Sequence, residues 1–459
     1  MKRLILIVTF GLLAFSCATY YQKNIKFNQE FISGRLDEAE KTLNSSKKKA
    51  AEGKERFLYF VNQGTVLHLL GRYEESNYWF EKAFIFTEDY SKNYLNEALT
   101  FVINPMTTVY PGEDQERLYV LYYKAMNYMK LGNIEAALVE CRRLNNLSYR
   151  LADKYKSKNK FKEDAFVHNL MGILYESDLN YNDAFIAYRN AYKIYKGEYT
   201  RLFSIGPPEQ LKKDILRTAY LTGFYDEVEA YEKEFGMKYE HEPMAGKGSL
   251  VFFWNNGLGP VKDEWSINFT VVHGGPGFVT FDSPELGGIT FPFRFDPGDG
   301  DLSDLNFIRV AFPKYLERKP IFTGANLEAN GQISTFDLGE NVNAISFKVL
   351  NERMLATFGK SLLRVAFKQA AAMAAREKNE GLGLAVSLLG AITEKADTRN
   401  WQTLPHSIYY TRMALPEGEN VVKLNLNGIR NIDQTKKFKY DIRENRTSFQ
   451  TFFSLESQM

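Results

Sequence analysis

The feature that most constrains the fold of this 459-residue chain is a short pattern that recurs five times in its first half. Each copy has a tight turn and an acidic residue, followed by apolar residues at helical spacing. The copies are marked by Gly34, Gly71, Gly132, Tyr181 and Gly223. Because Gly readily ends a helix in a left-handed conformation, each copy predicts two antiparallel helices joined by a turn.

Gly71-Arg72-Tyr73-Glu74-Glu75-Ser76, with Phe80 and Ala83, resembles the turn and second helix of a tetratricopeptide repeat, and the resemblance extends over residues 25–240. It places Gly64 and Gly172 where the two helices of a repeat approach closely, and it implies an α-solenoid with a concave groove. The family's usual groove positions fall on His68, Tyr119, Tyr122, Met126, Met129, Phe166, Asn169 and Glu176.

Two interpretations of these groove residues stay open. The Tyr and Met side chains of the third repeat offer an adaptable surface, which suits an extended peptide or a helix of a protein partner. In the other interpretation, the same side chains contact a neighbouring repeat or a second domain.

The apolar period changes after Pro243. Short strand-like runs such as Ser249–Trp254 alternate with Gly, Pro and Asp turns, and one long amphipathic helix is predicted over residues 352–379. The sequence therefore predicts an α+β multidomain protein. An all-α solenoid over residues 17–245 is followed by a β-rich domain with one covering helix over 246–430, and by a C-terminal tail over 431–459.

The first 16 residues have the pattern of a secretory signal peptide, because a positive start precedes a twelve-residue, mostly apolar stretch that is too short to span a bilayer. Ala14-Phe15-Ser16-Cys17 resembles a bacterial lipobox. The resemblance implies cleavage before Cys17 and acylation of that residue, and two or more acyl chains anchor a protein stably. Ala18 in place of Asp favours the outer membrane, with the body of the protein in the periplasm. Ordinary secretion is the alternative.

Charge and cysteine content argue against nucleic-acid binding and against a reactive thiol. Lys and Arg number 58 against 56 Asp and Glu, so the chain lacks the bulk basicity that holds nucleic acid. Cys141, the one other cysteine, falls on a helical core position and is predicted to be a buried, inert thiol. The lysine runs at 47–49 and 156–162 are predicted to be solvated, with contact to anionic headgroups as the alternative.

The segment Ala396–Trp401 is the second candidate site. Together with Gly257–Lys262 it resembles a family of uncharacterised bacterial repeat-containing lipoproteins. Genes of that family often neighbour those of lipoprotein activators of peptidoglycan synthases, which implies a role in the cell envelope. Asp397 and Arg399 can pair, and Trp401 can stack on the guanidinium. A structural corner and a ligand site both fit these residues.

The chain shows no pattern of a known catalytic site. Its five His residues lack zinc-ligand spacing, and neither a nucleophile elbow nor a phosphate-binding loop is present. Residues 296–304 offer several Asp carboxylates but miss the order of a calcium loop. We therefore predict neither a metal nor a cofactor.

The sequence favours a periplasm-facing, outer-membrane lipoprotein that acts as a non-catalytic, protein-binding scaffold, with a role in envelope biogenesis. The alternative is an envelope enzyme or glycan-binding protein. Its site would lie in the β-rich domain near His273, the acidic loop at 296–304 or Trp401.

Overall fold

The computed structural model describes residues 19–93, 106, 108–154, 163–274, 278–283, 289–294, 306–354, 361–362, 365 and 395–458. Cys17, the lysine run at 156–162, the acidic loop at 296–304 and most of the helix predicted over 352–379 lie outside these residues. Residues 342–354 are helical.

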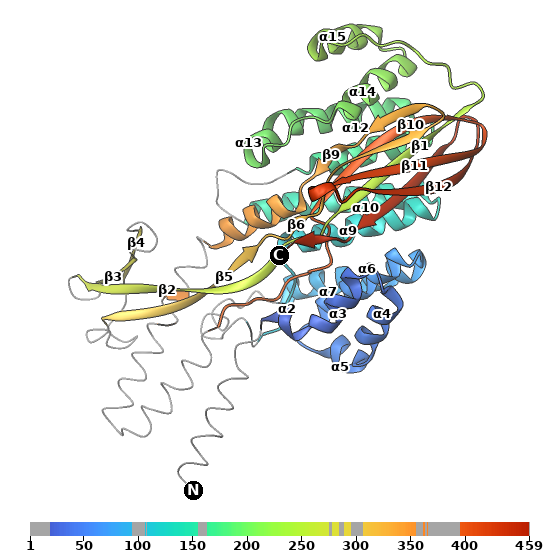
Figure 1. Ribbon diagram of the computed structural model, residues 1–459. Coiled ribbons are helices and arrows are strands. Elements are labelled where there is room, and N and C mark those ends of the chain that lie inside the picture. The colour runs from blue at the N-terminus through green and yellow to red at the C-terminus, as the bar shows by residue number, and fades with distance from the viewer. Residues whose placement is uncertain are drawn as a thin grey trace, which may run out of the picture.

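Five helix hairpins follow one another in the first half of the chain, as the repeats predict (Figure 1). They pair α3 (Ile25–Ile32) with α4 (Leu36–Asn44), α6 (Arg56–Leu69) with α7 (Tyr73–Asn93), α9 (Asp114–Lys130) with α10 (Ile134–Lys154), α11 (Ala165–Ser177) with α12 (Tyr181–Ile194), and α14 (Glu209–Thr222) with α15 (Tyr225–Phe235). The shorter helices are α2 (Tyr20–Lys23), α5 (Lys47–Glu52), α13 (Thr200–Phe203) and the π-helix η2 (Tyr195–Tyr199). Each hairpin contacts the next, so together they form an α-solenoid.

The turns and close approaches of the hairpins have the geometry that the repeat pattern predicts. Gly34, Gly71, Gly132 and Gly223 all have a positive φ, between 70° and 84°. A Cβ on Gly64 would lie 2.8 Å from the ring of Phe80, so only glycine allows α6 to approach α7 this closely.

The second half of the chain forms three four-stranded sheets. The inner sheet has the order β13 (Thr447–Ser454), β1 (Lys247–Asn256), β10 (Ser407–Pro416), β9 (Asp337–Glu340). The outer sheet has the order β12 (Gln434–Ile442), β11 (Gly418–Gly428), β7 (Phe322–Ala329), β8 (Gln332–Thr335). The arm sheet has the order β4 (Ile289–Arg294), β3 (Phe278–Ser283), β2 (Val261–His273), β5 (Phe307–Leu316). A short pair joins β6 (Lys319–Pro320) to β14 (Ser457–Gln458).

The inner sheet is the middle layer of the molecule, with the outer sheet on one face and the solenoid on the other (Figure 1). Phe252 and Trp254 of β1 belong to the core shared with the outer sheet, whereas Val251 and Phe253 belong to the core shared with the helices. Both faces of β1 are therefore buried, which explains its uninterrupted apolar sequence.

Residues 431–458, predicted as a tail, form β12, β13 and β14 and belong to these sheets. β13 runs parallel to β1, whose sequence lies almost 200 residues earlier. β12 carries lysines between its apolar residues, which hides its strand pattern. The β-rich region therefore extends to the end of the described chain.

The arm sheet extends to one side of the sandwich (Figure 1). One of its faces, which includes Ile267, Phe269 and Val310, packs against Leu362 and Val365. Its neighbouring strands pair antiparallel. Lys262 of β2 and Tyr315 of β5 also contact Glu113 and Gln115 of the solenoid.

Candidate functional site

The inner sheet of the chain itself covers the predicted solenoid groove. None of the eight predicted groove residues has more than 7% of its surface exposed. The ring of His68 lies 5.5 Å from that of Phe453 on β13, and the ring of Phe166 lies 6.3 Å from that of Phe253 on β1. Of the two interpretations of these residues, the structure places them against the second domain.

Burial beneath the inner sheet changes the hydrogen bonding and the pKa of His68. Its Nδ1 lies 2.6 Å from Oδ1 of Asn127, inside the protein. Burial lowers the pKa of His68 to about 4, so the imidazole is neutral near pH 7. His68 is therefore a hydrogen-bonded core histidine in this structure.

Residues 395–406 form a mostly buried connector without regular secondary structure, and this connector leads into β10. The Arg399 guanidinium pairs with Asp397 through Nε–Oδ1 and Nη2–Oδ2 contacts of 2.8 and 2.7 Å. It also donates to the Thr108 carbonyl and faces the ring of Tyr110 at 5.1 Å. Arg399 thus ties the connector to the segment that precedes the third hairpin.

Trp401 lies inside the solenoid–sheet interface. Its ring packs against those of Phe80 and Tyr123, and its backbone N–H donates to Oε1 of Glu116 over 2.7 Å. Tyr110, rather than Trp401, therefore faces the Arg399 guanidinium. Of the two interpretations of Asp397, Arg399 and Trp401, these contacts match the structural corner.

Sequence reasoning missed a buried charge cluster beside the connector. Glu113 forms ion pairs with Lys262 of β2 and with Arg353, and Nζ of Lys262 also donates to the Arg399 carbonyl over 3.0 Å. Burial opposes ionisation of Glu113, but the two cations outweigh it and hold its pKa at about 2. The spacing of Glu113 and Glu116 indicates a capping box at the start of α9, but not the partners that lie far away in sequence.

Glu116 has the opposite electrostatic character. It accepts hydrogen bonds from Tyr110 Oη at 2.8 Å and from the Glu113 backbone at 3.0 Å. Burial, reinforced by the neighbouring Glu113 carboxylate, raises the pKa of Glu116 to about 7. Two carboxyl groups three residues apart therefore differ in charge over a wide pH range, and both join α9 to the β-rich region.

An open cleft of about 800 Å³ lies between α14, residues 237–244 and one edge of the sandwich. Its floor is an ion network that joins α11, α14 and β10. Glu176 pairs with Arg217 at 2.7 Å and with Arg412 at 2.8 Å, and Asp214 lies 3.3 Å from Arg412. Burial would raise the pKa of Glu176, but the two guanidinium groups lower it to about 2, so Glu176 stays ionised near pH 7.

The rim of this cleft carries accessible apolar residues among charged ones. Ile333 of β8 is 70% exposed, and Leu179 and Leu221 of the solenoid also reach solvent. β8 is the edge strand of the outer sheet. An edge strand offers backbone N–H and C=O groups to an extended chain, so the cleft combines a hydrogen-bonding edge with apolar contacts.

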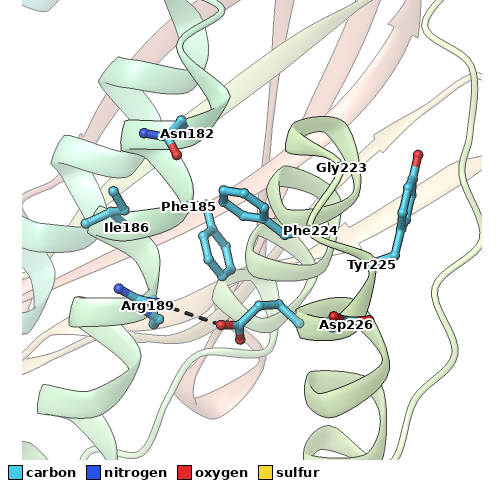
Figure 2. Close-up of a pocket in the computed structure, with 9 residues that line it drawn as sticks. Asn182, Phe185, Ile186, Arg189, Gly223, Phe224, Tyr225 and Asp226 are labelled. Carbon is cyan, nitrogen blue, oxygen red and sulfur yellow. Dashed lines mark ion pairs between the residues drawn. The ribbon is translucent and has the colours of Figure 1, made fainter.

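Figure 2 shows a second hollow, on the outer surface of the last two hairpins. Phe185 of α12 and Phe224 face one another with ring centres 5.5 Å apart, and Arg189 lies 3.9 Å from Glu227 across the hollow. Here the side chains mainly contact each other, so the hollow joins α12 to the α14–α15 turn.

The other sequence candidates lie apart. His273 is exposed at the end of β2, whereas the connector contacts Lys262 near the start of that strand. Eleven strand residues correspond to roughly 35 Å, so His273 and Trp401 do not share a pocket. Burial raises the pKa of the Cys141 thiol, and the side chain lies in the solenoid core.

Two kinds of feature are absent from the described residues. No helix there is both long and apolar enough to cross a bilayer. No group of three His, Cys, Asp or Glu side chains in the same part of the chain is placed to hold a metal ion.

No family model matches the sequence, and no curated protein matches it. Solved structures similar to this chain include the MamA protein (15% identity, 47% of this chain and 94% of that one, TM-score 0.28). They also include BtubC from P. vanneervenii (16%, 48% and 82%, TM-score 0.32) and a tetratricopeptide repeat protein from Parabacteroides merdae (16%, 48% and 80%, TM-score 0.24). These scores are low, so the description of the hairpins rests on their own geometry.

Proposed function

We propose that this chain is a lipid-anchored, non-catalytic scaffold on the periplasmic side of the outer membrane, and that it binds a protein partner in the cleft beside α14. The lipobox at Cys17 supports the anchor. The likeness of the connector to envelope lipoproteins supports a role in envelope biogenesis. The cleft is the proposed docking site because the solenoid groove is already filled by the inner sheet.

The observation that carries this proposal is the exposed apolar residue on an edge strand. Ile333 of β8 lines the same cleft as Leu179 and Leu221, and all three side chains reach solvent. A partner segment in an extended conformation would pair with β8 and place an apolar side chain between them. Glu176, a predicted groove residue, lies on the cleft floor beneath such a segment.

Photocrosslinking in growing cells tests the docking site. A benzophenone amino acid in place of Ile333 should give one discrete crosslinked protein band, and Leu221→Asp should weaken that band. The matched control is the same substitution at Val421, which is also exposed on the outer sheet but lies away from the cleft. Equal bands from both positions, or no band from position 333, would contradict the proposal.

Labelling with radioactive palmitate tests the anchor separately. The wild-type chain should incorporate label and sediment with membranes, whereas Cys17→Ala should do neither. Label in the variant would exclude Cys17 as the acylated residue.

A further inference from the structure

We propose that the first helix hairpin rests on phospholipid headgroups and that the cleft consequently points away from the bilayer. The inference depends on the acylation of Cys17 proposed above, and it adds a membrane-facing surface and an orientation. The partner of this surface is a lipid surface that carries anionic headgroups.

The chain between the acylated Cys17 and the folded body, here called the tether, is very short. Only Ala18 and Thr19 separate Cys17 from Tyr20, the first residue of α2. Tyr20 is 6% exposed and belongs to the core shared by the solenoid and the sheet, and its backbone N–H donates to Oγ1 of Thr398 over 3.1 Å. Thr19 caps α2, with its side chain accepting from the Gln22 backbone. The chain is therefore fixed to the body from Thr19 onward.

Three residues of extended chain span roughly 10 Å, so the Tyr20 Cα lies within that distance of the Cys17 Cα. Acyl chains on Cys17 are buried in hydrocarbon, which holds this residue at the level of the headgroups. The protein body cannot stand away from the membrane on such a tether. The surface around α2 must therefore face the bilayer.

The charge of this surface matches anionic headgroups. α2 contacts α3, on which the Lys26 side chain is 76% exposed, and Lys23 and the Lys47–Lys49 run of α5 are also exposed. Residues 20–56 contain nine Lys or Arg and six Asp or Glu, a net charge of +3, whereas the whole chain has +2. The excess positive charge is thus concentrated next to the anchor, where anionic lipids attract it.

The cleft lies at the other end of the solenoid. Figure 1 shows α3 and α5 at one end of the molecule and α14 and α15 at the opposite end. Because α14 and residues 237–244 form one wall of the cleft, its rim is far from the anchor. A partner would then approach from the side away from the membrane.

Energy transfer from the protein to labelled lipids tests this orientation. The acylated protein is reconstituted in vesicles of phosphatidylethanolamine and phosphatidylglycerol that carry an acceptor dye on the headgroups. A donor dye is attached to Lys26→Cys in one sample and to Lys238→Cys, beside the cleft, in the other. Cys141 is buried and Cys17 is acylated, so only the introduced thiol reacts. Transfer from position 26 should be severalfold greater than from position 238.

A linker variant separates the effect of the tether from that of the anchor. Twelve Gly and Ser residues inserted between Ala18 and Thr19 add a mean reach of roughly 20 Å. Vesicle binding should persist while the difference between the two labels shrinks. Full binding with equal transfer from both labels of the parent protein would overturn the orientation alone. Loss of vesicle binding by the parent protein would overturn the proposed acylation, and the orientation with it.

Discussion

Residue 172 has to be glycine, because the structure leaves no room for a side chain there. A Cβ there would collide with the ring of Tyr188. That ring cannot easily move, because its hydroxyl donates to Glu176 at 2.8 Å and lies 3.1 Å from a nitrogen of Arg412. A single methyl group at this position therefore disturbs both the hairpin and the ion network beneath the cleft.

We predict that Gly172→Ala lowers the free energy of unfolding by about 1–3 kcal/mol, the usual cost of overpacking. The matched control is Gly197→Ala, because a Cβ on Gly197 meets no atom within 4 Å. Urea denaturation of both variants measures the effect. Equal midpoints for the two variants would contradict the close approach of α11 and α12.

Glu116 is the residue at which we expect a measurable pH dependence. Its pKa is about 7 in the folded protein, above the ordinary 4.5, so the native state holds a proton that the unfolded state loses between pH 4.5 and 7. The stabilisation is complete below pH 4.5 and is lost as the pH rises to about 7. Glu116→Gln stays neutral and should remove this loss, which is on the order of 3 kcal/mol.

Unfolding free energies of the wild type and Glu116→Gln, compared from pH 4.5 to 8, check this prediction. His68 has the opposite effect, because its lowered pKa costs stability as the pH falls from 6.5 to 4. Both proteins contain His68, so its contribution cancels in the difference. Parallel curves for the two proteins would exclude a proton on Glu116.

Among the elements, β13 connects distant parts of the chain most directly. It pairs with β1 from Ser249–Thr447 to Asn256–Ser454, and its Phe449 and Phe453 pack on the solenoid. A chain that ends at residue 443 should therefore lose cooperative unfolding, because the inner sheet loses a strand and the groove loses its cover. A chain that ends at 456, which lacks only β14, is the control. Limited proteolysis distinguishes them, and equal resistance would contradict the role of β13.

The same elements show what the sequence can predict. Turns at Gly71 and Gly132 and the close approach at Gly64 depend on residues a few positions apart, so the repeat pattern predicted all five hairpins. The contact of Phe166 with Phe253, and of Glu113 with Lys262, joins residues that are far apart in the chain. Spacing alone contains no information about such pairs, so the filled groove and the charge cluster were beyond sequence reasoning.

In the whole molecule, the solenoid and the β-rich region share one hydrophobic core. Residues of α6, α9 and α11 contact β1, β10 and β13 without an intervening solvent layer. We therefore predict a single unfolding transition for the chain, with coincident loss of helical and aromatic circular dichroism signals. Two separate transitions would indicate that the two regions fold independently.

The covered groove also restricts how this protein can change in evolution. Solenoids commonly grow or shrink by whole repeats, because each repeat contacts only its neighbours. Here two separate repeats meet particular strand residues: His68 of the second hairpin meets Phe453, and Phe166 and Glu176 of the fourth hairpin meet Phe253 and Arg412. If one repeat were gained or lost between them, the later hairpins would no longer lie opposite their partner residues on the strands. Relatives that keep this architecture should therefore also keep the number of hairpins.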